Sequence, residues 1–213
     1  MNDKLKNRLI SIAKEKIVND DISHDFEHAL RVLANAERIC NEEGGDLDVI
    51  IPSALFHDII VYPKNHPKSK DASDESAELA KEILENIKEY PKERVGKVYT
   101  AIKQCSFSKG IIPELKEAKI LQDADKLEST GVISIMRTFS SSGQMLRPYY
   151  NSDDPFCENR EPEDLKYSVD VFYSRLLRVK DRMHTKKAKK IAERRERVLL
   201  KFLDELKLEL QGK

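Results

Sequence analysis

The chain has 213 residues, a length that suits one domain or one domain with a helical extension. Lysine plus arginine number 38, and so do aspartate plus glutamate, so the formal net charge is zero and no overall field attracts nucleic acid or anionic membranes. The three cysteines, Cys40, Cys105 and Cys157, form neither a CxxC zinc motif nor a disulfide framework. The first residues do not resemble a signal peptide, and no apolar run approaches the roughly 20 residues of a membrane span. We therefore expect a cytoplasmic protein that does not enter a membrane.

Apolar residues recur at helical spacing along most of the chain, which predicts an all-α protein. The first helix is expected over residues 5–17, and the second contains His28 and ends near Gly44-Gly45. A short apolar segment over residues 49–59 would also suit a buried strand, but the next helical patterns follow too closely for a sheet. Proline, glycine and asparagine predict loops at 63–67 and 143–162. The remaining helices are expected over residues 73–90, 91–103, 113–128, 164–182 and 186–210.

Histidine and aspartate occur together in three short motifs. His24 and His28 lie in SHDFEHALRV, His57 and Asp58 in ALFHDI, and Asp125 in LQDADKLEST. Burying the His57-Asp58 pair at the end of an apolar run costs roughly 2–7 kcal/mol for each polar group that lacks a partner. A divalent cation held by several of these side chains would remove that cost. For the pair alone, a helix-capping aspartate beside a hydrogen-bonded core histidine explains the pattern equally well.

The ordered pattern H…HD…D resembles the HD-domain superfamily of metal-dependent phosphohydrolases. It is most similar to the small, mostly uncharacterised members whose first motif reads HDxxHxxRV. The likeness runs from about Leu5 to the final helix, and it includes Lys64-Asn65, AIKQCSFS, AKILQDADKLESTG and the segment Asp153-Asp154-Pro155-Phe156. It implies an all-α HD-domain helical bundle with a C-terminal helical extension. A single domain would span residues 1–213, with a core over about 20–130 and residues 131–213 packed on it.

The resemblance also implies a set of metal ligands. The family's ligand histidine stands three residues before the Arg-Val pair, which selects His28, and its last ligand aspartate directly precedes a basic residue and leucine, which selects Asp125. With His57 and Asp58 they make a set of two histidines and two aspartates, which suits Mn, Co, Ni, Fe, Zn or Mg better than Ca. Asp123 points away from the face of Asp125 and is expected to support the ligands by hydrogen bonding.

Four further side chains, together with Asp58, are candidates for catalysis. His24 could face the substrate or support a ligand, and Arg31 could bind phosphate or orient Asp58. Lys64 is expected on the loop that follows the HD motif. Ligand-binding residues are common on loops, so Lys64 is expected to bind phosphate. Lys126 either contacts phosphate or forms a salt bridge.

Three other features of the sequence each have more than one explanation. Many relatives have a histidine before Ser-Phe-Ser, where this chain has Cys105, which is either a ligand for a soft ion or a small buried apolar residue. This change makes a two-metal site less probable. Glu78 could be a general base or a surface residue. The basic run from Lys186 to Arg197 is most simply a solvated helix face, so nucleic acid is an unlikely partner.

The function predicted from these motifs is metal-dependent hydrolysis of a small phosphorylated metabolite, most plausibly a nucleotide, by metal-bound water. The alternative is a non-catalytic nucleotide- or metal-binding protein that keeps the HD cage. Lyase or di-iron oxygenase chemistry on the same cage is a third and more distant reading.

Overall fold

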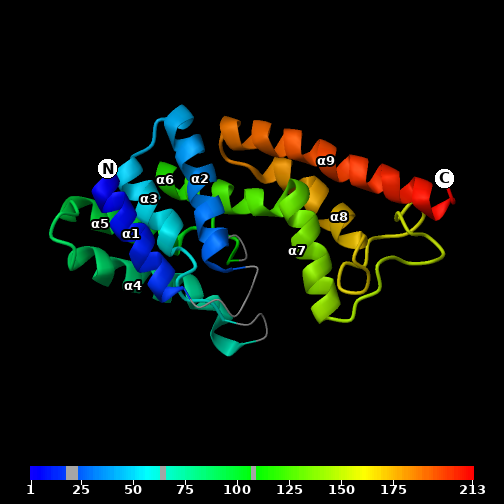
Figure 1. Cartoon of the computed structure of the whole chain (residues 1–213), viewed down its shortest axis with the longest axis horizontal. Coiled ribbons are helices and arrows are strands. Elements are labelled where there is room, and N and C mark those ends of the chain that lie inside the picture. The colour runs from blue at the N-terminus through cyan, green and yellow to red at the C-terminus, as the bar shows by residue number, and fades with distance from the viewer. Residues whose placement is uncertain (18–23, 63–65, 107–108) are drawn as a thin grey trace. The chain divides into compact units, whose positions relative to one another are not determined.

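The computed structural model of the chain describes residues 1–17, 24–62, 66–106 and 109–213. These residues form helices, turns and loops without a β-strand, which confirms the predicted all-α bundle (Figure 1). The chain divides into two compact units, Met1–Asp125 and Lys126–Lys213. No helix in the described ranges is long and apolar enough to cross a membrane. The prediction of a single domain with a core over about 20–130 stays a prediction.

The first unit is built around a short apolar helix. The helices of this unit are α1 (Asp3–Lys16), α2 (Phe26–Glu43), α3 (Leu47–Phe56), α4 (Ala72–Glu85), α5 (Val95–Lys103) and α6 (Lys116–Lys126), with 3-10 turns η1 (Pro67–Lys70) and η2 (Lys92–Arg94). Every residue of α3 from Val49 to Phe56 is buried, and α3 packs against α1, α2, α4 and α5. A helix that is apolar on all sides is stable only when it is surrounded, so α3 forms the centre of this unit.

The ends of α2 follow from local sequence. Asp25 is the N-cap, and its carboxylate accepts a hydrogen bond from the His28 N–H at 2.8 Å. At the other end Gly44 adopts φ +74°, the left-handed conformation that glycine tolerates best, as the Gly44-Gly45 pair predicts. The helix begins at Phe26, so His24 precedes it.

Helix α3 ends at Phe56, three residues before the predicted end. The Ser76 hydroxyl on α4 accepts from the Ile60 N–H at 3.2 Å and lies 3.3 Å from the Ile60 carbonyl. In a continued helix the Ile60 N–H would donate to the carbonyl four residues earlier, whereas here it donates to Ser76. His57 and Asp58 therefore lie in the turn that follows α3.

The second unit has its own aromatic and aliphatic core. Its helices are α7 (Gly131–Gln144), α8 (Asp170–Ser174) and α9 (Lys186–Leu210), with 3-10 turns η4 (Leu127–Ser129) and η5 (Leu176–Arg182). The core residues are Val169, Phe172, Leu176, Leu199 and Leu203. Helix α9 matches its predicted bounds, and Thr185 caps it by accepting from the Ala188 N–H.

Two predictions for this unit were wrong. A continuous helix over 164–182 is replaced by turns, α8 and η5, because the N–H groups of Ser168 and Val169 donate to the carbonyls of Pro148 and Tyr149 instead of to a preceding helical turn. Helix α7 was not expected, since its serines and threonine favour a helix only weakly. Its Ile135 and Phe139 pack against the core, which supplies the missing stabilisation.

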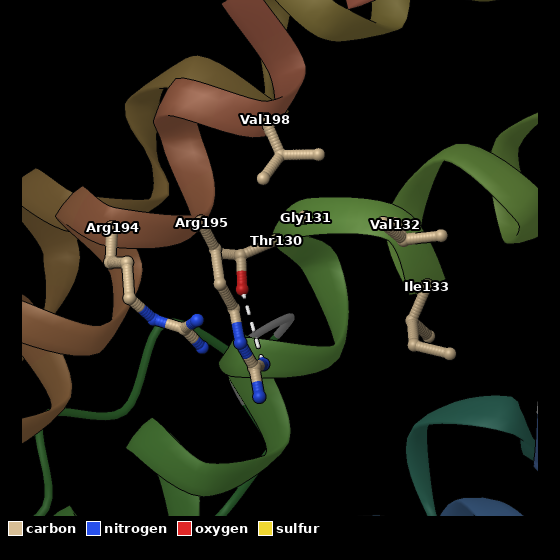
Figure 2. A pocket seen from close by; sticks show the side chains of 7 residues that line it. All are labelled: Thr130, Gly131, Val132, Ile133, Arg194, Arg195 and Val198. Carbon is tan, nitrogen blue, oxygen red and sulfur yellow. Dashed lines mark hydrogen bonds between the residues drawn. The ribbon is translucent and has the colours of Figure 1, made fainter.

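Arg195 of α9 contacts the residues that precede and begin α7 (Figure 2). Arg195 Nη1 donates to the Leu127 carbonyl at 2.9 Å and lies 3.4 Å from the Thr130 hydroxyl. Gly131 has φ +66°, and a Cβ there would lie 3.2 Å from the Arg195 side chain. Glycine is therefore required at this position both by its backbone conformation and by the close approach of Arg195.

Candidate metal centre

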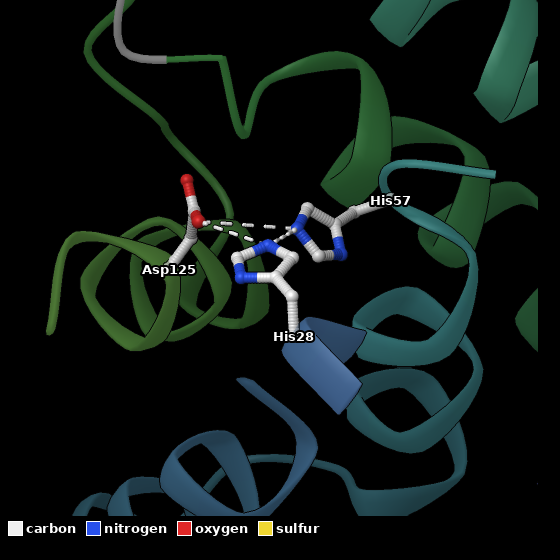
Figure 3. A group of neighbouring side chains, drawn as sticks. All are labelled: His28, His57 and Asp125. Carbon is white, nitrogen blue, oxygen red and sulfur yellow. Dashed lines mark hydrogen bonds and ion pairs between the residues drawn. The ribbon is translucent and has the colours of Figure 1, made fainter. Parts of the chain in front are cut away.

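Three segments of the first unit bring the predicted ligands together. His28 lies in the first turn of α2, His57 and Asp58 in the turn after α3, and Asp125 near the end of α6; Figure 3 shows the two imidazoles and the Asp125 carboxylate directed at one another. Both histidine side chains are 1 % exposed, whereas Asp58 and Asp125 are 32 % and 35 % exposed. The imidazoles thus form the inner wall of the cluster, and the carboxylates lie on its solvent side.

The separations between the donor atoms suit a single ion. His28 Nε2 lies 3.3 Å from His57 Nε2, and the two nitrogens lie 3.6 and 3.9 Å from Asp125 Oδ1. Asp58 Oδ2 lies 3.7 Å from His28 Nε2 and 3.5 Å from His57 Nε2. Two atoms that each lie about 2.0–2.2 Å from one ion can be no more than roughly 4.4 Å apart. Each of these separations meets that limit.

The protonation of His57 also fits a cation. Its Nδ1 lies 2.9 Å from the carbonyl oxygen of Ala54. A carbonyl can only accept, so Nδ1 carries the proton and Nε2 presents its lone pair to His28 and the two aspartates. A backbone partner of this kind sets the tautomer of histidines that bind metals. These residues therefore fit a divalent cation.

Electrostatics keep Asp58 ionised. Burial raises the pKa of its carboxyl, but the positive charge that His57 carries when it is protonated and the interaction with His28 lower it more, with a further contribution from His24. The net effect holds the pKa of Asp58 well below its usual range. The side chain can therefore act as an anionic ligand throughout the physiological pH range.

Two of the candidate catalytic residues flank the cage on the α2 side. The His24 ring packs edge-on against His28, with ring centroids 5.7 Å apart. Helix α2 begins at Phe26 after the Asp25 cap, so His24 lies before the helix and not on its face. Arg31 is half-buried on the next turn of α2. Their roles in substrate binding stay predictions.

The other candidates have partners elsewhere, are exposed or fall outside the described ranges. Lys126 Nζ donates to the Arg182 carbonyl at 2.8 Å and lies 3.4 Å from His184 Nε2, so its ammonium has partners within the second unit. Its contact with phosphate stays a prediction. Lys64 and Asn65 fall outside the described residues. Glu78 is exposed on α4, in keeping with a surface residue.

Two residues of α6 close to Asp125 in the chain are buried. Asp123 is fully buried two residues before Asp125. Gln122 was missed by the sequence reasoning: its Nε2 lies 3.4 Å from the carbonyls of both Gln104 and Ile111 and so holds the two ends of one loop. Its position three residues before Asp125, on the same helix face, was the available signal.

That loop carries Cys105, which is 4 % exposed. Burial raises the pKa of its thiol well above the ordinary value, and the negative charges of Asp58 and Asp125 raise it further. A thiol in this environment stays protonated. The structure thus favours a small buried residue beside the cage over a thiolate ligand.

Comparison with known proteins agrees with the site. Residues 25–130 match the HD domain family, and a protein of known structure from Listeria innocua, Lin1889, is 30 % identical, with a TM-score of 0.69 over 99 % of this chain and 98 % of that one. The chain belongs to the HD superfamily of hydrolases. The structure of an HD-superfamily hydrolase from Bacillus thuringiensis is 27 % identical, with a TM-score of 0.73, and the match covers 99 % of this HD protein and 98 % of that chain.

A second HD relative is YpgQ of Bacillus subtilis, named as an uncharacterised protein. It is 28 % identical over 203 residues, which make up 93 % of this chain and 90 % of YpgQ. The crystal structure of YpgQ in complex with ADP aligns with a TM-score of 0.72 and 24 % identity, over 97 % of this chain and 95 % of that one.

Proposed function

We propose that this HD protein is a divalent-metal-dependent phosphohydrolase that acts on a small phosphorylated metabolite, with nucleotides as the substrate class. The observation that carries the proposal is the convergence of His28, His57 and Asp125, whose donor atoms all lie within 4.8 Å of one another, with Asp58 Oδ2 3.5–3.7 Å from both imidazole nitrogens and one histidine tautomer set by a backbone carbonyl. Four such electron-pair donors suit Mn, Co, Ni, Fe, Zn or Mg. The HD-superfamily hydrolases among the relatives support a hydrolytic reaction.

The choice of nucleotides has separate support. YpgQ matches nearly the whole of this chain in sequence, and its crystal structure holds ADP. A nucleoside diphosphate combines phosphoryl oxygens, which a cation binds, with a base that a pocket beside it can hold. ADP is therefore the first ligand to test.

The candidate residues have separate proposed roles. His28, His57, Asp58 and Asp125 hold the cation, and the partial exposure of the two aspartates leaves the cage open to solvent and substrate. When bound, the cation polarises a phosphoryl oxygen and lowers the pKa of a coordinated water. His24, whose ring packs against that of His28, is proposed to contact the substrate or the attacking water.

Positive side chains complete the proposed site. Arg31 and Lys64 are proposed to offset the negative charge that develops on the phosphoryl group, because phosphoryl transfer depends mainly on positioning and charge stabilisation. Lys126 is a weaker candidate for this role, since its ammonium donates to the Arg182 carbonyl.

The test is a screen of phosphorylated metabolites with metal-reconstituted protein, run beside the Asp58→Ala variant. We expect phosphate or pyrophosphate release that stops with chelator, returns with Mn, Co or Ni, and increases with pH. Asp58→Ala should be inactive at every metal concentration. If metal-loaded protein binds nucleotides but releases phosphate from none of them, and Asp58→Ala loses this binding too, the non-catalytic alternative is correct.

A further inference from the structure

A second cluster of charge lies in the first unit, outside the four ligands. Lys109 Nζ lies 2.6 Å from Asp74 Oδ2, and Lys103 Nζ lies 3.6 Å from Asp74 Oδ1. The two lysines differ in exposure, since the side chain of Lys109 is 19 % exposed and that of Lys103 is 51 % exposed. Two ammonium groups thus face one carboxylate, and the nearer of them belongs to a side chain that is largely buried.

Two sets of contacts connect Lys109 to the segments that carry the cage aspartates. The loop that contains it is held at both ends by Gln122, three residues before Asp125 on α6. Three residues along a helix correspond to a rise of about 4.5 Å. Asp74 lies in the first turn of α4, and Ser76 in the same helix is hydrogen-bonded to Ile60, two residues after Asp58. Gln122 thus lies three residues from Asp125, and the helix that carries Asp74 is bonded through Ser76 to a residue two positions after Asp58.

The electrostatics of Cys105 agree with this placement. After burial, the largest influences on the pKa of its thiol are the charges of Asp58 and Asp125, which raise it, and the charge of Lys109, which lowers it. Cys105 directly follows Gln104, whose carbonyl lies 3.4 Å from Gln122 Nε2 on α6, so the contacts also connect the thiol to the helix that carries Asp125.

We propose that Lys109 is a phosphate-binding residue of the candidate site, whose ammonium holds a phosphoryl oxygen of a nucleotide bound at the cage. This inference rests on the proposed function and adds to it the residue that recognises the phosphate. An ammonium has three donors, so Lys109 can keep its bond to Asp74 and still bind a phosphoryl oxygen. Asp74 then positions the lysine, and Lys103 helps to neutralise Asp74.

The experiment measures binding of α,β-methylene-ADP, which resists hydrolysis at the bridging position, to manganese-loaded protein by titration calorimetry. Lys109→Ala should weaken binding about 10- to 100-fold, the usual effect of one charge-assisted hydrogen bond. Lys109→Arg should restore most of the affinity. Lys103→Ala is the matched control, because it removes the other lysine on Asp74, and it should change the affinity by no more than about threefold. Manganese content should be equal in all of these proteins.

Asp74→Asn separates a direct role from a structural one. It removes the charge of the shared partner but keeps the Lys109 ammonium, so analogue binding should persist. Loss of binding in Asp74→Asn as large as that in Lys109→Ala would show that Lys109 only supports the loop, and the proposal would be overturned. The same conclusion follows if Lys109→Ala binds the analogue as the wild type does, or if the metal-loaded wild type does not bind it.

These outcomes are independent of turnover. Wild-type protein that hydrolyses a nucleotide while Lys109→Ala keeps full affinity contradicts the role of Lys109 alone. Lys109-dependent binding of the analogue without turnover of any nucleotide contradicts the proposed reaction alone.

Discussion

Each unit holds aspartates in a charged cluster, and the two clusters differ in how the charges are matched. In the second unit Asp170 is fully buried, and both of its oxygens accept hydrogen bonds from the Arg160 guanidinium. The Glu163 N–H donates to the same carboxylate at 2.7 Å. Arg160 also donates to the carbonyl of Asp154, whose own carboxylate accepts from the N–H groups of the following turn. In this cluster each charge is matched by an opposite charge or a hydrogen-bond donor.

The cage of the first unit has a different composition. Its facing atoms are two imidazole nitrogens and two carboxylate oxygens, and at least the Nε2 of His57 presents a lone pair. When both imidazoles are neutral, these atoms are all electron-pair donors and do not neutralise one another. A buried charged pair with matched donors and acceptors stabilises a fold. Several electron-pair donors directed at one point instead form a site for a cation.

The largest expected effect is on metal binding. His57→Ala and Asp58→Ala should each abolish stable binding, because each removes a direct ligand. Asp123→Ala should lose at most the roughly 10- to 100-fold typical of residues that support ligands. Calorimetric titration with Mn and metal analysis of the purified variants measure both effects. Equal losses for Asp123→Ala and an Asp125→Ala variant would contradict the assignment of Asp125.

The second-unit cluster of Asp170, Arg160 and Asp154 should affect the stability of the protein and not its metal content. Arg160→Met leaves Asp170 buried without its cation and should lower the free energy of unfolding by about 3–5 kcal/mol. Lys207→Met is a suitable control, because its ion pair with Glu158 is exposed on both sides and should contribute nothing measurable. Urea unfolding measures the difference. Loss of manganese binding by folded Arg160→Met would show that the two clusters are not separate in function.

The same cluster predicts a pH dependence. Burial raises the pKa of Asp170, but the bonds from Arg160 and Glu163 lower it more, so the folded-state pKa is below the ordinary value. The contribution of Asp170 to stability is then present above its unfolded pKa of about 3.9, and it is lost as the pH falls through the folded-state value. Unfolding free energies from pH 7 to pH 3 should fall more steeply below about pH 4 in the wild type than in Asp170→Asn. Parallel curves would contradict this expectation.

The smallest effects are expected from two helix caps. Asp25 caps α2, which carries His28, and Thr185 caps α9 in the other unit. Alanine at either position should lower the free energy of unfolding by about 1 kcal/mol. Only Asp25→Ala should also weaken manganese binding, because the bond from Asp25 is made to the backbone of a ligand. Equal manganese affinity in both variants would show that α2 holds His28 in place without its cap.

The candidate ligands could be chosen from sequence because the motifs are local. His28 precedes Arg-Val on an amphipathic helix, His57-Asp58 ends an apolar run, and Asp125 precedes Lys-Leu, so each position can be identified from its neighbours in the chain. The ends of α2 and the whole of α9 could be predicted for the same reason, since caps and apolar stripes are short-range signals. Whether these side chains bind a metal is a question for the variants above.

The tertiary structure decided what depends on contacts between distant segments. The all-α fold and the H…HD…D motif could be predicted from the sequence alone, because helical periodicity and motif spacing depend on residues that are close in the chain. The sequence did not determine that Ser76 ends α3 before His57, that the Pro148 and Tyr149 carbonyls interrupt the helix expected over 164–182, or that Lys126 donates to Arg182. Each of these outcomes is a competition between a local hydrogen bond and a partner far along the chain. The partner prevails only where packing brings it within reach, and a linear pattern does not contain that information.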